Sequence, residues 1–312
     1  MGETVNESFE QKYLIGTWSW GKGGNGSKMV FGQTFSEDQL REVFEKAYES
    51  GFTAWDTAEV YGMGASELLV GKFTKGKEVF LSTKHFPNKK YKEGENRKAL
   101  MASMQRLGIS KVDLYWLHSP KEIEKNTKEL AELQKEGLIG HIGLSNGNVD
   151  QIKLARKILE ENGCTLYAIQ NHYSLLAMDR EEDVRAYCQE NQILFFGYML
   201  LEQGALSGHY DQTKHFSPFT FRGMMFTKKK FQKIDALIQY IRELGKEYDV
   251  DASQIAVIWG RSKGIIPIVG INKPRHVAPL VKGLEIELKK EEVLQLEKLA
   301  RESGVTQKGT WE

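Results

Sequence analysis

Residues 52–66 read Phe-Thr-Ala-Trp-Asp-Thr-Ala-Glu-Val-Tyr-Gly-Met-Gly-Ala-Ser, and they join an apolar, strand-like run to a glycine-rich turn. The run ends at a carboxylate, Asp56, and a phenol, Tyr61, follows five positions later in the turn. Two further apolar runs end in the same manner, one at Lys84 and one at His118. Polar groups at the ends of successive strands are typical of an acid–base site at the mouth of a barrel.

Eight short apolar runs alternate with longer segments of helical periodicity. Several runs are almost continuously apolar, which is typical of buried parallel strands. The first helical segment has Ser36 and Gln39 in the positions of a capping box and Gly51 just past its end. The pattern predicts an α/β fold, a (β/α)8 TIM barrel, in which residues 1–312 form a single domain. The expected strands cover residues 13–18, 52–56, 79–84, 112–118, 139–146, 165–170, 193–198 and 265–269.

A doubly wound sheet of six strands is the alternative fold. It is disfavoured because no G-x-G-x-x-G motif opens a helix after the first expected strand. The segment 199–230 interrupts the alternation of strands and helices, and it is rich in Gly, Phe and Met. Long loops of this kind in compact barrels are usually functional or mobile. We therefore expect a long loop after strand seven.

The bulk composition excludes several classes of partner. The formal net charge is +1, so no charge bias points to nucleic acid or to a membrane surface. The two cysteines, Cys164 and Cys188, lack the spacing of metal ligands and are expected to be reduced thiols, with no metal bound. The first seven residues are polar and acidic, without a hydrophobic targeting stretch. These features predict a cytoplasmic protein.

The four polar residues form a chemically coherent set. A free tyrosine has a pKa of about 10 and is a poor proton donor at neutral pH. A nearby ammonium group such as that of Lys84 would lower the pKa of Tyr61, and the carboxylate of Asp56 would keep Lys84 charged. His118 can donate a hydrogen bond to a substrate oxygen and fix its orientation.

The pattern D-T-A-E-x-Y-G, with S-T-K and L-H further along, resembles the aldo-keto reductase family over nearly the whole chain. The resemblance implies that Tyr61 is the proton donor in the reduction of an aldehyde or ketone, that Asp56 and Lys84 tune it, and that His118 orients the carbonyl. The set contains no hydride source, so a nicotinamide cofactor must supply one. Two other functions stay open: a cofactor-sensing regulatory subunit of the same fold, as in potassium channels, and a barrel hydrolase that uses paired carboxylates.

The resemblance also implies a cofactor site. Ser145, Asn146 and Gln170 would bind the nicotinamide carboxamide, and the ring of Tyr198 would stack on the nicotinamide. After strand seven the chain has Tyr-Met-Leu-Leu where the family commonly has Tyr-Ser-Pro-Leu, so contacts to the pyrophosphate must use backbone groups. The expected cofactor-binding residues are Gly16, Thr17, Trp18, Asp56, Ser145, Asn146, Gln170, Tyr198, Met199, Leu201, Gln203, Gly204, Leu206, Val269, Gly270, Asn272, Lys273, Arg275 and His276.

The loop 270–276 bears on cofactor choice, because it contains Lys273, Arg275 and His276 and no acidic residue. Basic groups bind a 2′-phosphate, whereas sites that prefer NAD typically offer a carboxylate to the ribose. The loop therefore favours NADP(H). Asn272 and Leu280 depart from common residues of the family, so NAD(H) stays possible.

The substrate pocket is expected to be aromatic. Trp18, Trp20 and Phe86 follow strand ends and, with Tyr61 and His118, would line a pocket for a small-molecule carbonyl without a charged handle. The sequence does not distinguish sugars, pyridoxal-like aldehydes, quinones and xenobiotic carbonyls, and it does not predict the oligomeric state.

Overall fold

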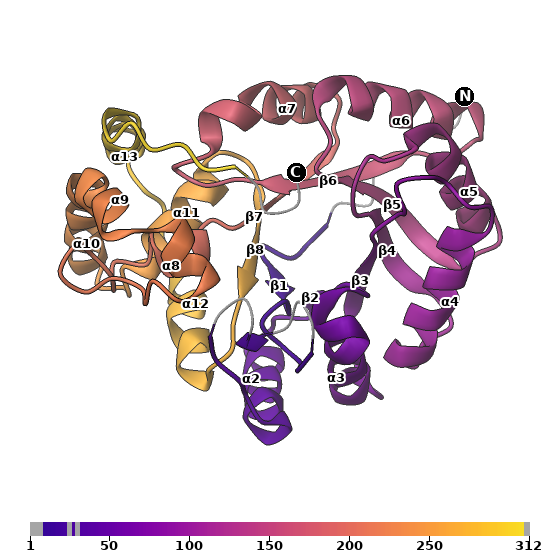
Figure 1. Ribbon diagram of the computed structural model, residues 1–312, viewed down its shortest axis with the longest axis horizontal. Helices are drawn as coiled ribbons and strands as arrows, with labels where there is room; N and C mark the ends of the chain where they lie inside the picture. Colours follow the sequence, from indigo (N-terminus) through magenta and orange to yellow (C-terminus); the bar gives the residue numbers. More distant parts are fainter. Residues whose placement is uncertain (1–8, 24–26, 29–31, 309–312) are drawn as a thin grey trace.

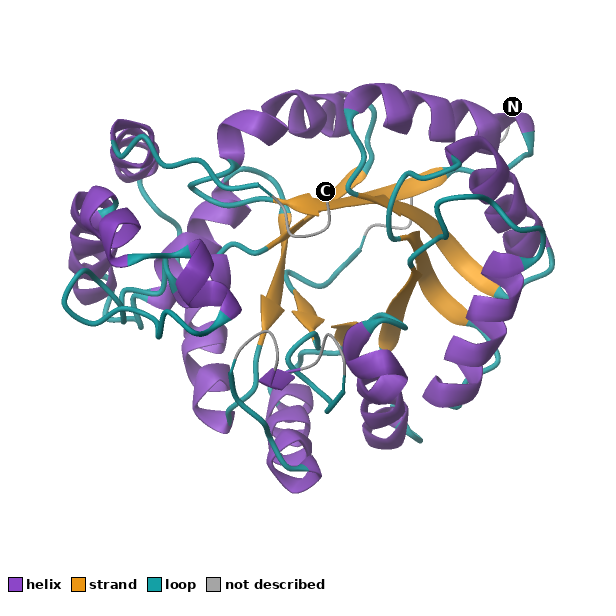
Figure 2. Cartoon of the chain, in the orientation of Figure 1, coloured by secondary structure: helices purple, strands orange, loops and turns teal. Residues whose placement is uncertain are grey.

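A computed structural model describes residues 9–23, 27–28 and 32–308. Its centre is a closed barrel of eight parallel strands in the order of the chain, each paired with the next and the eighth with the first. Figures 1 and 2 show the helices outside this barrel. The predicted (β/α)8 barrel is therefore confirmed. The strands are β1 (Leu14–Gly16), β2 (Ala54–Asp56), β3 (Phe80–His85), β4 (Val112–Leu117), β5 (Ile139–Ser145), β6 (Leu166–His172), β7 (Leu194–Tyr198) and β8 (Ile266–Gly270).

The apolar faces of the helices and the residues that cap their ends determine where the helices form. The predicted capping box is present, because Ser36 accepts a hydrogen bond from the backbone of Gln39 while the Gln39 side chain accepts one from Ser36. Gly51, just past the helix end, has a φ of 88° that favours glycine. The main helices are α2 (Glu37–Glu49), α3 (Ala65–Thr74), α4 (Glu95–Leu107), α5 (Ile123–Lys135), α6 (Val149–Glu161), α7 (Met178–Glu190), α10 (Asp235–Glu247), α11 (Ser253–Ser262), α12 (Val277–Gly283) and α13 (Lys290–Glu302).

The segment after β7 is more ordered than a long loop. It contains a 3-10 turn, η2 (Glu202–Gly204), and two short helices, α8 (Phe221–Met225) and α9 (Lys228–Lys233), before α10. Thr220 and Thr227 cap the short helices, since each hydroxyl accepts a hydrogen bond from the backbone three residues later. The long connection predicted after strand seven is therefore present, and it contains two short helices whose caps the sequence analysis did not identify. Figure 1 shows these helices together on one side of the barrel.

The interior of the barrel is filled by large side chains. Trp116 is fully buried there and packs against Phe196 at a centroid distance of 5.5 Å. Its ring lies against Gly143 of the next strand, where an added Cβ would lie 2.1 Å from the indole. A glycine is therefore required at position 143. Because side chains fill the interior of the barrel, the cavity lies beyond the ends of the strands.

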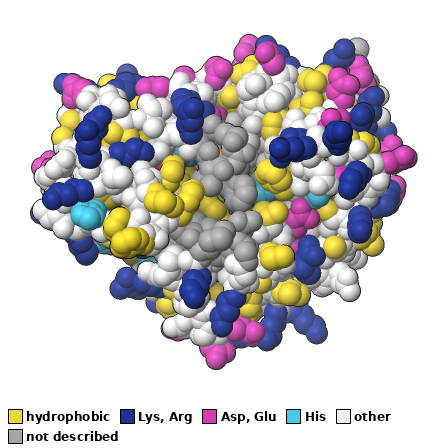
Figure 3. Space-filling model, viewed as in Figure 1, with side chains coloured by type: hydrophobic (Ala, Val, Ile, Leu, Met, Phe, Trp, Pro, Cys, Tyr) yellow, Lys and Arg dark blue, Asp and Glu magenta, His cyan; other side chains and the backbone are white. Residues whose placement is uncertain are grey.

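On the face of the molecule seen in Figure 3, charged side chains of both signs are interspersed. Figure 3 shows the Lys and Arg side chains distributed over the visible face. In the part of the chain that the structure describes, no helix has the length and apolar character needed to cross a membrane.

Candidate active site

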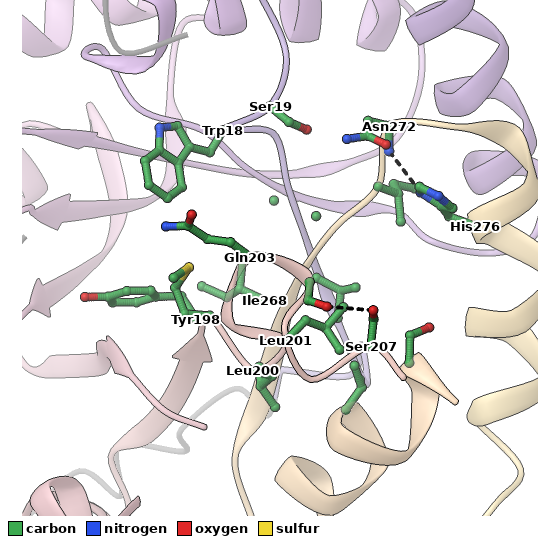
Figure 4. A pocket seen from close by; sticks show the side chains of 18 of the residues that line it. Trp18, Ser19, Tyr198, Leu200, Leu201, Gln203, Ser207, Ile268, Asn272 and His276 are labelled. Atoms are coloured by element: carbon green, nitrogen blue, oxygen red, sulfur yellow. Dashed lines mark hydrogen bonds between the residues drawn. The ribbon is translucent and has the colours of Figure 1, made fainter. Parts of the chain in front are cut away.

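Strand ends from around the barrel meet at one cavity of about 710 Å³. Asp56 ends β2, Ser145 ends β5 and Tyr198 ends β7, while His118 follows β4 directly. Figure 4 shows Trp18 and Tyr198 on one side of this cavity and Asn272 and His276 on the other. The predicted site residues that line it are Gly16, Trp18, Asp56, Tyr61, His118, Ser145, Gln170, Tyr198, Met199, Leu201, Gln203, Gly204, Val269, Gly270, Asn272, Lys273, Arg275 and His276.

A buried ion pair lies behind the cavity. The ammonium of Lys84 contacts the Asp56 carboxylate and donates to the backbone oxygen of Thr57 at 2.8 Å. Ser82 and Gln170 donate to the other Asp56 oxygen at 2.5 and 3.3 Å. Burial lowers the pKa of Lys84, and the adjacent Asp56 carboxylate opposes that shift. The pair is stable in a dry environment because the carboxylate has several donors besides the ammonium.

Tyr61 begins a strained turn, η1 (Tyr61–Gly64), between β2 and α3. Met63 has a φ of 56°, in the left-handed region that favours glycine. Gly64 at the end of the turn has a φ of 90°, a backbone conformation that favours glycine, and its Cα lies close to the Arg106 side chain. Arg106 in turn donates to the buried Glu67 of α3 at 2.6 Å. These contacts hold the phenol over the ion pair, with the Lys84 nitrogen 5.2 Å from the ring centre.

The predicted tuning of Tyr61 is corrected by the structure. The pKa of Tyr61 is raised well above its usual value of 10.0, first because the phenol is buried and then because it faces Asp56 and Tyr198. Lys84 was expected to lower this pKa, but its charge is largely neutralised by the adjacent Asp56. The phenol therefore keeps its proton at neutral pH, and the raised pKa makes it a weaker acid than free tyrosine.

His118 is held as a neutral imidazole. Its pKa lies well below the usual 6.5, chiefly because of burial, with further contributions from Lys84, His85 and Lys121. The ring approaches Tyr61 edge-on, at a centroid distance of 6.3 Å. A neutral imidazole beside the phenol can donate one N–H to a substrate oxygen.

Asn146 was predicted to bind the nicotinamide carboxamide, but its side-chain amide contacts other residues of the site. Its amide nitrogen donates to the backbone oxygen of His118 at 2.9 Å, and its amide oxygen accepts from the Tyr198 hydroxyl at 2.6 Å. Asn146 therefore braces two residues of the site and does not line the cavity, whereas Ser145 and Gln170 do. A polar residue after a strand end was a correct signal for the site, but the sequence could not show which way its amide faces.

Three other predicted residues lie in the core. Thr17 is fully buried, and its hydroxyl donates to the backbone oxygen of Asp56 at 2.9 Å. Leu206 is fully buried as well, in the main hydrophobic core. Trp20 packs on Trp55 and donates from its indole to the backbone oxygen of Ile271 at 2.7 Å. Thr17 and Leu206, predicted at the cofactor, and Trp20, predicted at the substrate, are buried and are not among the residues that line the cavity.

Trp18 and Phe86 lie near the proposed reacting groups. The Trp18 ring stacks on Tyr61 at a centroid distance of 6.0 Å and lines the cavity. Phe86 contacts the edge of His118 at 5.4 Å, and the Lys121 ammonium lies 4.0 Å from the centre of its ring. Two aromatic rings therefore lie beside Tyr61 and His118, and of the two, Trp18 lines the cavity whereas Phe86 does not.

The end of the cavity opposite Tyr61 and His118 carries less positive charge than expected. Burial and the neighbouring Arg275 and Lys273 lower the pKa of His276 to about 4, so His276 is neutral at physiological pH. Its ring accepts a hydrogen bond from the backbone of Asn272 at 3.5 Å. The cationic cluster predicted for loop 270–276 is therefore reduced to Lys273 and Arg275.

An acidic residue from outside the loop 270–276, Asp251, which precedes α11, lines the same cavity. Its carboxylate pairs with His209 at 3.3 Å, and this contact raises the pKa of the imidazole. Asp251 and His209 are far apart in the sequence, so only the folded chain reveals that they meet.

Other cavity residues were missed by the sequence analysis. Gln254 of α11 and Arg222 of α8 line the cavity, as does Lys214. Among the described residues, Gln203 Oε1, Gln254 Oε1 and Arg222 Nε are buried without a hydrogen-bond partner. Unpaired buried polar atoms in a cavity wall are suited to a polar ligand. The length of the segment 199–230 was the only signal for Lys214 and Arg222.

The residues that the structure describes contain no group of three or more His, Cys, Asp or Glu side chains placed to hold a metal ion.

Comparison with known proteins agrees with this architecture. The model of the aldo/keto reductase family matches residues 13–301, so the chain belongs to that family. It is 32% identical to pyridoxal reductase, chloroplastic, of Arabidopsis thaliana over 311 residues, which cover 93% of this chain and 83% of the relative. It is 29% identical to aldo-keto reductase yakc [NADP(+)] of Schizosaccharomyces pombe, with 86% and 84% covered.

The fold has close counterparts among solved structures. The glycerol dehydrogenase AKR11B4 from Gluconobacter oxydans superposes with a TM-score of 0.82 at 23% identity. The similarity covers 96% of this chain and 94% of that chain, so the whole barrel is shared.

Proposed function

We propose that this protein is an NADP(H)-dependent oxidoreductase that reduces an aldehyde or ketone to the alcohol. The observation that carries the proposal is the position of Tyr61 and His118 at one end of a cavity that holds Lys273 and Arg275 at the other. A cavity with acid–base groups at one end and cations at the other suits a nicotinamide dinucleotide and a small carbonyl compound. In this proposal, residues 1–312 form one domain and the protein acts in the cytoplasm.

The chain's own residues provide binding and proton transfer. The bound nicotinamide supplies the hydride. Tyr61 gives the proton of its hydroxyl to the carbonyl oxygen, and its raised pKa keeps that proton available. His118, as a neutral imidazole, donates an N–H to the same oxygen and sets its direction. Asp56 and Lys84 form the rigid, buried support below the phenol.

The cofactor site would use the opposite walls of the cavity. Ser145 and Gln170 would bind the carboxamide, Tyr198 would stack on the nicotinamide, and Lys273 and Arg275 would bind the 2′-phosphate. The name of the Schizosaccharomyces pombe relative, which includes NADP(+), supports this choice. The pairing of Asp251 with His209 supports it as well, because this contact raises the pKa of His209 and a hydrogen-bonded carboxylate repels a phosphate less.

A cofactor-oxidation screen tests the proposal. Purified protein would be incubated with NADPH or NADH and a panel of aldehydes and ketones, and cofactor absorbance would be followed. We expect oxidation of NADPH with at least one carbonyl and slower oxidation of NADH. Binding of NADPH without turnover of any carbonyl would instead favour the cofactor-sensing regulatory subunit.

A further inference from the structure

The loop that follows β7, residues 199–204, has an unusual backbone. Met199, Glu202 and Gln203 have φ values of 65°, 47° and 55°, and none of them is glycine. Side chains disfavour this left-handed region, so such residues persist only where the surroundings hold them in place. The loop contains no proline that would fix the backbone. Something else must therefore hold its shape.

The carboxylate of Glu202 provides that hold. Glu202 points away from the cavity and is only 1% exposed. One of its oxygens accepts from Nε2 of His172 at 2.6 Å and from the Ser174 hydroxyl at 2.5 Å. His172 and Ser174 lie at the end of β6, and both are buried. A buried carboxylate is costly unless it has such donors, so the contacts restrict the loop to the observed conformation.

The same imidazole also supports the Tyr198 ring. His172 pairs with Tyr198 in the register of β6 and β7, and the two rings stack at 5.7 Å with an interplanar angle of 20°. At the far end of the Tyr198 side chain, the hydroxyl donates a hydrogen bond to Asn146. His172 therefore lies between the phenol ring that faces the cavity and the carboxylate that holds the loop.

We propose that Glu202, His172 and Ser174 are positioning residues that hold loop 199–204 and the Tyr198 ring ready for the cofactor. We call these three residues the β6 pin. Met199, Gln203 and Gly204 line the cavity, and Figure 4 shows Gln203 and Tyr198 on the same wall. The pin acts on the half of the cofactor that carries nicotinamide and diphosphate, and not on the adenosine end near Lys273. The inference rests on the proposed function, because it assumes a nicotinamide dinucleotide in this cavity.

The test compares a whole cofactor with a fragment of it. The dissociation constants of NADPH and of adenosine 2′,5′-bisphosphate would be measured by tryptophan fluorescence for the parent protein and for Glu202→Ala. We expect Glu202→Ala to weaken NADPH about tenfold or more, the change expected when one charge-assisted hydrogen bond is lost. The bisphosphate, which reaches only the adenosine end, should bind within about twofold of the parent. Glu202→Gln keeps an acceptor oxygen and should restore part of the loss.

Two further variants separate the pin from general stability. Ser174→Ala removes one donor to Glu202 and should also weaken NADPH binding. It provides the test if Glu202→Ala does not fold. Glu129→Gln is the matched control, since Glu129 is a buried carboxylate of α5 that accepts from Asn96 and from the backbone of Arg97. It should leave the NADPH dissociation constant unchanged.

The outcomes distinguish the pin from the proposed function. Equal weakening of NADPH and bisphosphate in Glu202→Ala, or unchanged NADPH binding in both Glu202→Ala and Ser174→Ala, would overturn the pin alone. Failure of the parent protein to bind either ligand would overturn the proposed function and, with it, the premise of the pin.

Discussion

At the scale of single residues, burial determines the protonation states in this site. The buried phenol of Tyr61 has a raised pKa and the buried imidazole of His118 a lowered one, so both groups are neutral at physiological pH. The charge in the site lies in the Asp56–Lys84 pair beneath them. Two neutral hydrogen-bond donors above a buried ion pair suit the reduction of a carbonyl, since the proton to be transferred is already in place.

These protonation states predict the pH dependence of both directions. Carbonyl reduction needs protonated Tyr61 and neutral His118. Its rate should therefore change little between pH 6.5 and about 9, because the pKa of His118 lies below this window and that of Tyr61 above it. Alcohol oxidation needs the phenolate, so its rate should rise with pH through the same window. Initial rates in both directions across this range check the prediction; an oxidation rate that reaches a plateau below pH 8 would contradict it.

Lys84→Met tests the ion pair. The substitution leaves the Asp56 carboxylate buried without its ammonium and exposes Tyr61 to an uncompensated negative charge. Breaking a buried pair costs about 3–5 kcal/mol of stability. We expect a clearly lower unfolding temperature and loss of most activity in both directions. Thermal unfolding and steady-state rates measure these effects, with Lys282→Met of the exposed Lys282–Asp249 pair as the control.

At the scale of secondary-structure elements, the strands were predictable and the capped segments between them were not. All eight predicted runs overlap strands of the barrel, because parallel strands buried on both faces must be continuously apolar. The polar residues at their ends were also a sufficient signal for Asp56, His118 and Tyr198. Trp18 and Trp20 follow β1 outside the strand, so strand alternation could not show that one faces the cavity and the other the core.

Gly143→Ala tests the packing inside the barrel. The added methyl would lie against the Trp116 indole in a filled interior, where overpacking typically costs about 1–3 kcal/mol. The free energy of unfolding from urea titration should fall by about that amount. Trp116→Phe makes room beside position 143, so the double variant should be less destabilised than the sum of the two single variants. Strict additivity would show that the two side chains do not compete for the same space.

At the scale of the whole molecule, one cavity connects residues from distant parts of the chain. Tyr61 and Lys273 lie more than two hundred positions apart, and the segment after β7 adds Lys214 and Arg222 to the same wall. Asp251 and His209 reach the same cavity from separate loops. The sequence predicted the end of the cavity built by strand termini. It could not predict the wall built by loops, because their conformations depend on tertiary contacts.

Cofactor choice is a property of this larger arrangement. Replacing both Lys273 and Arg275 with Ala should weaken the binding of NADPH strongly, since each lost charge-assisted contact to the 2′-phosphate costs about 1.5–3 kcal/mol of binding free energy. NADH lacks that phosphate and should bind almost as before. Fluorescence titration of both cofactors measures the difference, and Lys290→Ala with Lys298→Ala on helix α13 removes the same charge elsewhere. Equal losses for both cofactors, or tighter NADH binding in the parent, would instead favour an NAD(H) enzyme.

The assignment of Tyr61 as the proton donor is the central claim, and the rate of NADPH-dependent carbonyl reduction by Tyr61→Phe tests it most directly. The Tyr115→Phe variant is the matched control, because it removes a buried hydroxyl from the core. We expect Tyr61→Phe to fold and to bind NADPH like the parent, while its turnover falls by about 10²–10⁴-fold, the usual contribution of a general acid. Tyr115→Phe should keep near-normal turnover. Near-normal turnover of a good carbonyl substrate by Tyr61→Phe would contradict the account.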